Sequence, residues 1–183
     1  MPVKLADIVR LKGDLVTALA QCATNKTLRH GLAEDFLLPI LYFCIGCREH
    51  EMKPIEQFVQ HEKVELEKNL LMALPRLEDN LDAQYTGLGV ESVMRFRQLR
   101  SALQFLQDDI VNEQRDEVKV KMDELMGSAF LKDVDNDLTH WAEDREWDYD
   151  RDFDLRFVPL SHHWWLEVQR EKSREKFGLV QPS

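Results

Sequence analysis

Residues 90–130 read VESVMRFRQLRSALQFLQDDIVNEQRDEVKVKMDELMGSAF, and their apolar residues recur at intervals of three and four. This spacing matches one face of an α-helix and predicts a helix over the whole stretch. The interval 113–117, in the middle, is polar on every side. The apolar positions form two sets of equal spacing, Leu99, Leu103, Leu106 and Ile110, then Val118, Met122, Leu125 and Ala129.

A continuous helix over 90–130 would be about 60 Å long, from the rise of an α-helix. A compact bundle of 183 residues cannot cover a helix of that length along its whole extent. Two outcomes are therefore expected. Either the helix breaks near 112–117, or it projects and pairs with a second helix. A homodimer through the long helix is the form that the second outcome would take.

The rest of the chain also has helical spacing, so the predicted fold class is all-α, an irregular bundle of about five helices. We expect a single domain over residues 1–183. Pro39 predicts a kink or a break, and Pro75 a kink or an end, because proline removes an internal hydrogen bond of a helix. The further helices are predicted at about 3–24, 28–50, 54–74 with a short continuation, and 161–177.

Composition and charge exclude several classes of protein. The chain has 34 Asp and Glu against 24 Lys and Arg, a net charge of −10. This charge argues against direct nucleic-acid binding through a basic surface and against docking on anionic membranes. The longest apolar run, residues 36–47, is too short to span a membrane and predicts a buried helix.

The expected compartment is the cytoplasm, where thiols stay reduced. Charged residues interrupt the apolar pattern of residues 1–24, so no secretory signal is expected there. The chain has 3 cysteines, an odd number that does not fit a disulfide framework.

The acidic charge is concentrated near the C-terminus. Residues 133–154 hold ten acids and two bases, a net charge of −8, within an acidic-aromatic segment that we place at 133–157. Between Trp147 and Phe157, aspartates alternate with aromatic, apolar or arginine residues. Alternation with a period of two predicts a short extended segment near 147–157, with acids on one side and rings on the other.

This segment has two interpretations. It is either an ordered edge whose acids are simply solvated, or a docking surface for a basic protein. Clustered carboxylates steer a basic partner, and buried aromatic rings anchor it. The candidate partner-binding residues are Trp147, Asp148, Tyr149, Asp150, Asp152, Phe153 and Asp154, with Trp164 on the predicted last helix.

A cysteine and histidine pattern predicts an alternative, metal-binding role. Cys44 and Cys47 are three residues apart, with His50 and His61 further along the chain. Thiolates and imidazoles at such spacings suit zinc, although a second closely spaced pair is lacking. The two cysteines also lie in the most apolar predicted helix, so packing in the core is the competing interpretation.

The aspartates that follow the long helix contain a partial calcium-loop pattern. Asp133, Asp135, Asp137 and Asp144 occupy the loop positions 1, 3, 5 and 12. Leu138 stands where the loop needs a glycine for its sharp turn, so the pattern is incomplete. A plain acidic junction between a helix and a loop is the simpler interpretation.

The chain has no phosphate-binding glycine loop and no recognisable nucleophilic triad, so no catalytic residue and no cofactor are predicted. The expected function is that of a non-enzymatic interaction protein, such as an inhibitor, an immunity protein, an adaptor or an assembly factor. It would dock on a basic protein partner through the acidic-aromatic segment. The alternative is a metal-binding helical protein or small metalloenzyme, using the Cys/His set or the Asp cluster.

Overall fold

The computed structural model describes residues 5–24, 32–49, 53–85, 90–144 and 159–162, and all structural statements concern these residues. The described residues confirm an all-α helical bundle, and none of them lies in a strand. No described helix is both long and apolar enough to cross a membrane. The α-helices are α1 (Leu5–Thr24), α2 (Leu32–Glu49), α3 (Lys53–His61), α4 (Lys63–Tyr85), α5 (Val90–Phe105), α6 (Asp116–Met126) and α7 (Ala129–Asp144).

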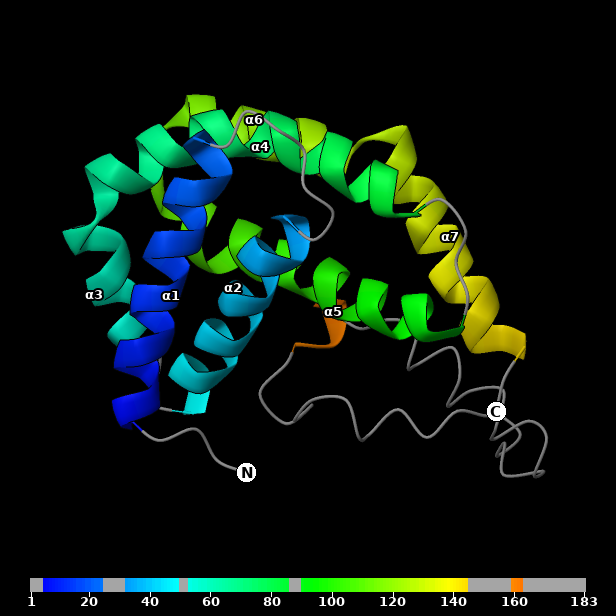
Figure 1. Cartoon of the computed structure of the whole chain (residues 1–183), viewed down its shortest axis with the longest axis horizontal. Coiled ribbons are helices and arrows are strands. Elements are labelled where there is room, and N and C mark those ends of the chain that lie inside the picture. The colour runs from blue at the N-terminus through cyan, green and yellow to red at the C-terminus, as the bar shows by residue number, and fades with distance from the viewer. Residues whose placement is uncertain (1–4, 25–31, 50–52, 86–89, 145–158, 163–183) are drawn as a thin grey trace, which may run out of the picture.

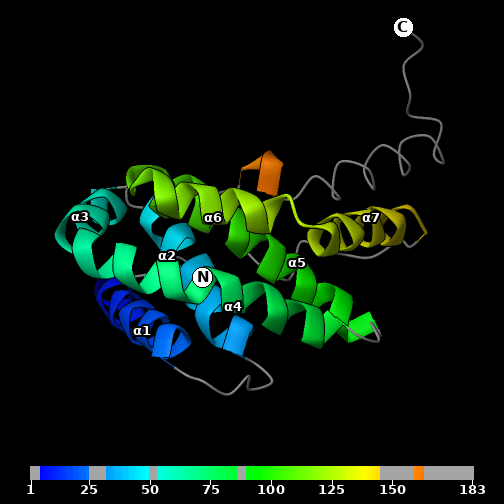
Figure 2. The same cartoon turned by 90° about the horizontal axis from the view of Figure 1, so that it is seen from above.

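Helix α2 lies at the centre of the bundle, in contact with α1, α3, α4 and α5. Helix α1 lies beside α2 and also contacts α4, while α6 lies along α4 (Figures 1 and 2). Helices α3 and α7 lie at opposite ends of the long axis in both views. This arrangement leaves α7 near the edge of the bundle.

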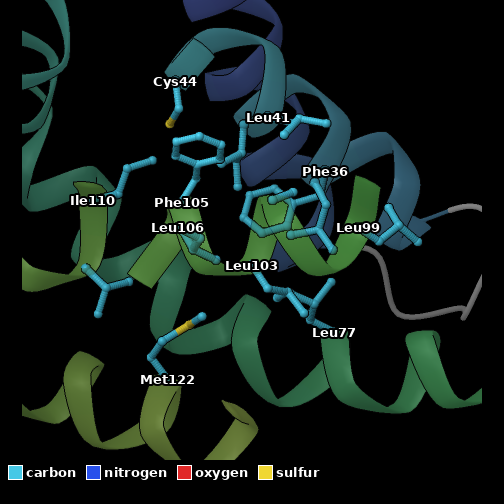
Figure 3. Close-up of a cluster of buried hydrophobic side chains, with 14 of the residues drawn as sticks. Phe36, Leu41, Cys44, Leu77, Leu99, Leu103, Phe105, Leu106, Ile110 and Met122 are labelled. Atoms are coloured by element: carbon cyan, nitrogen blue, oxygen red, sulfur yellow. The ribbon is translucent and has the colours of Figure 1, made fainter. Parts of the chain in front are cut away.

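The apolar half of α2 is buried, as its sequence predicts. Leu37, Ile40, Leu41 and Cys44 have essentially no exposed surface. Figure 3 shows Leu41 and Cys44 facing the core, where they meet Phe105. Helix α2 is continuous through Pro39. Burial of the surrounding side chains offsets the hydrogen bond that the proline lacks.

The helix predicted at 54–74 is interrupted at a different residue from the one expected, Pro75. Helix α3 ends at His61 and α4 begins at Lys63, so the interruption is at Glu62. Helix α4 runs through Pro75 instead of ending there. Pro75 faces solvent while its neighbour Leu74 is buried, so core packing keeps this helix intact.

The long helix predicted over 90–130 is broken, which is the first of the two outcomes expected for it. Helix α5 passes into a π-helix, η1 (Leu106–Ile110), and a short 3-10 turn, η2 (Val111–Glu113). Gln114 is extended, and α6 then starts at Asp116. The polar interval has no apolar face to bury, so packing does not hold it in the helix.

The region after residue 128 differs from the sequence expectation. Residues 129–144 form α7, whose buried side chains are Leu131, Val134, Leu138 and Ala142. The first part of the acidic-aromatic segment is therefore helical and packs through one face. Pro159 precedes a 3-10 turn, η5 (Leu160–His162). The predicted extended segment at 147–157 lies outside the described residues, as does most of the predicted helix 161–177.

Candidate functional site

The predicted docking residues lie outside the described part of the chain. This applies to Trp147, Asp148, Tyr149, Asp150, Asp152, Phe153 and Asp154, and also to Trp164. Their role as a partner-binding surface stays a prediction. The described elements that flank residues 145–158 in the sequence are α7, which ends at Asp144, and η5, which begins at Leu160.

The predicted zinc ligands are only partly described. Cys44 and Cys47 are buried free thiols on α2, whereas His61 is exposed at the end of α3, 3.9 Å from Glu62 Oε1. His50 lies outside the described residues. Among the residues that are described, no group of three Cys, His, Asp or Glu side chains is placed to hold a metal ion.

Both described thiols are held in the protonated form. Burial raises the pKa of the Cys47 thiol from 9.0 to about 12, and the charge of Asp109 adds to the effect. Burial also raises the pKa of Cys44 well above its ordinary value, again with a contribution from Asp109. Because the thiolate is the form that binds metals and attacks electrophiles, this environment keeps both thiols unreactive.

The partial calcium-loop pattern does not form a loop. Asp133, Asp135 and Asp137 lie within helix α7, so they are distributed around a helix. Asp135 accepts two hydrogen bonds from Arg100, at 2.8 Å from Nε and 3.2 Å from Nη2. The prediction of an acidic helix-to-loop junction at these positions is therefore wrong, because the buried side of α7 extends the helix beyond them.

Sequence reasoning missed a polar junction at the π-helix. We call it the π-helix junction and define it by Arg48, Phe105, Asp108, Asp109 and His162. The π-helix lets two consecutive aspartates reach partners on different elements. Asp109 pairs with Arg48 on α2, and Asp108 pairs with His162 on η5. Single π-turns inside α-helices occur frequently at functional sites.

The inner half of the junction is a buried ion pair. Arg48 Nη2 donates a hydrogen bond of 2.7 Å to Asp109 Oδ1, and the guanidinium lies 5.1 Å from the centre of the Phe105 ring. The Asp109 side chain is only 6 % exposed. Burial raises the pKa of Asp109, and the charge and hydrogen bond of Arg48 oppose that rise. A hydrogen bond from the Cys44 thiol to this carboxylate opposes the rise as well.

The outer half of the junction attaches η5 to the bundle. His162 Nε2 lies 2.9 Å from Asp108 Oδ2, and its ring meets Phe105 edge-on with the centroids 4.3 Å apart. His162 is buried although it belongs to a three-residue turn. One aromatic ring therefore contacts a cation on α2 and an imidazole on η5.

A row of polar side chains continues from the junction along α5. Gln104 Nε2 donates to Asp108 Oδ1 at 3.2 Å, and Arg100 Nη1 donates to Gln104 Oε1 at 3.3 Å. Successive members of this row are four residues apart, about one helical turn, so they share a face. The row therefore links Asp135 on α7 to His162 on η5.

The sequence contains one signal for this junction. Asp108 and Asp109 fall between the apolar positions Leu106 and Ile110, at the end of the strongest apolar stripe. A pair of acids next to a buried stripe indicates a bound cation or a local change of helix geometry. The cation comes from Arg48 on α2, and nothing in the local pattern identifies it.

The described C-terminal helices also expose many acids. We call the following set the acidic surface: Asp108, Glu113, Asp116, Glu117, Asp123, Glu124, Asp133 and Asp137, all of which are exposed. Asp116 and Asp123 lie seven residues apart on α6, as do Glu117 and Glu124, so each pair projects from one side of that helix. The charge concentration seen near the C-terminus thus extends back to the π-helix.

The fold and this surface define an all-α protein whose C-terminal helices are strongly acidic. The chain matches no protein-family model, no curated protein and no solved structure.

Proposed function

We propose that this chain is a non-enzymatic interaction protein that docks on a basic surface of another protein through its C-terminal half. The observation that carries the proposal is the distribution of charge. Residues 106–154 contain 17 acids and 6 bases, a net charge of −11, whereas the remaining residues have a net charge of +1. The electrostatic field of a strongly charged region steers partners of opposite charge towards that region.

The surroundings of the acids support a role in binding over a role in stability. Arg115 lies within the acidic stretch but pairs with Glu67 on α4, 2.7 Å away. Lys119 is 4.0 Å from the fully exposed Asp116, so this pair contributes little. Like charges that remain exposed repel one another and lower stability. A basic partner would remove this repulsion when it binds.

The aromatic residues of the segment would supply the anchors. Trp147, Tyr149 and Phe153 alternate with the aspartates at 148, 150, 152 and 154. Aromatic side chains that enter pockets of a partner supply much of the binding energy of an interface, while charges at its rim mainly govern the association rate. This division of roles suits an inhibitor, an immunity protein, an adaptor or an assembly factor.

The metal-binding alternative has less support. Burial raises the pKa of both described thiols, whereas His61 is exposed at the end of α3. Metal ligation by cysteine requires the thiolate.

The proposal is tested with two variants of equal charge. The first replaces Asp148, Asp150, Asp152 and Asp154 with asparagine. The control removes the same charge from exposed positions in the N-terminal half, by Asp35→Asn, Glu56→Gln, Asp79→Asn and Asp82→Asn. Immobilised wild type and both variants are used to capture proteins from the source cells, at low and at physiological salt.

We expect proteins that bind the wild type and the control but not the first variant. Their association rates with the wild type should fall as salt is raised, because exposed charges are screened. If the first variant captures the same proteins at the same rates as the wild type, the acidic-aromatic segment is not a docking surface. If both variants lose binding equally, net charge alone is responsible and the proposal of a localised surface is wrong.

A further inference from the structure

Helix α1 carries an apolar line on the side that faces away from the core. Val9, Gly13, Val16 and Ala20 are exposed, and none of their side chains has a polar atom. We call these four residues the α1 stripe. They recur at intervals of four, three and four, so they lie along one side of the helix. The outer side of a surface helix is ordinarily polar, so this composition favours contact with a second surface.

The α1 stripe is separate from the side of α1 that packs in the bundle. Leu15, Ala18 and Leu19 are buried, and α1 contacts α2 and α4. At 3.6 residues per turn, the stripe and these buried residues differ in mean direction by more than a quarter turn. Val9 is 71 % exposed and Val16 is 38 % exposed. Packing within one chain therefore does not account for these two valines.

Gly13 is not required by the packing of a single chain. A Cβ atom at this position would meet nothing beyond its own helix backbone within 4 Å. Glycine within a helix lowers helix stability relative to alanine, because it gives the unfolded chain more conformational freedom. In the middle of an exposed apolar line, a glycine lets a second helix approach closely. The open space above Gly13 therefore suits a side chain of a partner.

The α1 stripe is complementary to itself in the antiparallel direction, because large and small side chains alternate along it. We consider two antiparallel copies that meet about a two-fold axis beside residues 14 and 15. Val16 of each copy then faces Gly13 of the other, and Val9 faces Ala20. Large side chains opposite small ones fill an interface without voids. A parallel pair would instead place Gly13 opposite Gly13 and leave a gap.

The charge distribution also favours α1 as the place where two copies meet. Residues 106–154 have a net charge of −11, so two chains repel one another through this region. Helix α1 has two acids and two bases, and Arg10 and Asp14 are 3.7 Å apart on it. It lies away from α7 in Figures 1 and 2, and α4 lies between α1 and α6 in Figure 2. The neutral α1 is therefore electrostatically compatible with a second copy of itself, whereas the acidic α6 and α7 are not.

We propose that the α1 stripe is a homodimer interface, through which two copies of this chain pair by antiparallel α1 helices. This interface replaces the one expected of the long helix, which is broken. One helix pair buries less than the roughly 1,600 Å² of a standard interface, so the dimer should form reversibly at micromolar concentrations. The interface does not depend on the docking proposed above.

The interface is tested by analytical ultracentrifugation of the full chain at concentrations from about 1 μM to about 1 mM. We expect the average mass to rise from that of one chain to that of two. A chain that stays monomeric at every concentration overturns the proposal. Association beyond two copies also overturns it, because a two-fold pair is closed.

Two double variants of unchanged charge locate the interface. Val9→Gln with Val16→Gln makes the α1 stripe polar, and circular dichroism checks that the helices are retained. The matched control, Val64→Gln with Val120→Gln, changes exposed valines on α4 and α6. The first variant should raise the dissociation constant by at least about tenfold, since each dimer loses four buried valines. The control should keep the wild-type constant, and equal constants for the two variants overturn the proposal.

An exchange of side-chain size tests the antiparallel arrangement. Gly13→Val adds bulk where the single chain has open space, so the monomer should keep its fold. It places a valine opposite Val16 of the other copy, so the dissociation constant should rise by about tenfold. Gly13→Val combined with Val16→Ala again sets a large residue opposite a small one and should recover most of the affinity. A stronger dimer for Gly13→Val alone overturns this arrangement of the helices.

Salt separates this interface from the docking proposed above. Dimerisation should strengthen as salt is raised, because salt screens the repulsion between two acidic chains. Binding of a basic partner should weaken under the same conditions. A dimer that weakens as salt is raised is held by charges rather than by the α1 stripe, and this result would overturn the proposal.

Discussion

Arg48 and Asp109 are 61 residues apart in the sequence and 2.7 Å apart in the structure, where they join α2 to the π-helix. Neither residue has an obvious partner in its own helix. The pair exists because the π-helix turns Asp109 towards α2 while leaving Asp108 on the other side. The buried ion pair of Asp109 with Arg48 therefore lies where the helix predicted over 90–130 departs from α-helical geometry.

Removing one member of this pair should destabilise the protein strongly. Arg48→Ala leaves the buried carboxylate of Asp109 without its cation, so the free energy of unfolding should fall by roughly 3 kcal/mol. The exposed pair of Arg10 with Asp14 gives the control. Arg10→Ala should change the free energy of unfolding by less than about 0.5 kcal/mol. Urea unfolding measures both. A double variant, Arg48→Met with Asp109→Leu, should recover most of the loss, and similar values for Arg48→Ala and Arg10→Ala would contradict this account.

The raised pKa of Asp109 predicts an unusual pH dependence. A carboxyl whose pKa is higher in the folded than in the unfolded chain takes up its proton first in the folded state. Its contribution to stability is present below the ordinary value of 3.8 and is lost as the pH rises through the raised folded pKa. Relative to Asp109→Asn, which does not titrate, the wild type should therefore gain stability as the pH falls towards 3.8.

Urea unfolding of the wild type and of Asp109→Asn across this pH range gives the comparison directly. The difference between the two proteins cancels the titration of the other groups, provided that they are distant from the junction. If the wild type instead loses stability relative to the variant on acidification, the attraction of Arg48 outweighs burial, and the assigned direction of the pKa shift is wrong.

The two described thiols should be inert while the protein is folded. A pKa of about 12 in place of 9.0 lowers the thiolate fraction of Cys47 about a thousandfold near neutral pH, and burial blocks access as well. We expect Cys44 and Cys47 to resist iodoacetamide in the native chain and to react in urea, as measured by peptide mapping. EDTA should leave the melting temperature unchanged. A marked drop with EDTA would instead favour a bound metal, since structural zinc stabilises a fold by on the order of 10 kcal/mol.

The attachment of α7 should depend on Arg100. Its two hydrogen bonds to Asp135 are charge-assisted and mostly buried, so Arg100→Ala should lower the free energy of unfolding by about 2 kcal/mol. Hydrogen exchange should show the loss first in the amides of α7. The control is Lys68→Ala, which removes an exposed pair with Glu65. Equal exchange in the two variants would mean that apolar packing alone holds α7.

The helical class of the fold follows from the sequence, because the spacing of apolar residues is a local property. The stripe from Leu99 to Ile110 identifies buried positions, and the polar interval at 113–117 indicates the place of a break. The continuity at Pro75 could not be predicted in this way. Its neighbours Leu74 and Leu77 are buried by other helices, and that packing overrides the local preference of proline.

The charge distribution along the chain likewise follows from the sequence, since a net charge is a sum over residues. The π-helix junction was decided only by the tertiary structure. Arg48, the adjacent Asp108 and Asp109, and His162 come from three separate parts of the chain, and no sequence pattern relates these three parts. The physical reason is that a buried charge must find its counterion wherever the packing of the helices brings one within hydrogen-bond distance. Such long-range pairs depend on the whole fold, whereas helix periodicity depends only on neighbours along the chain.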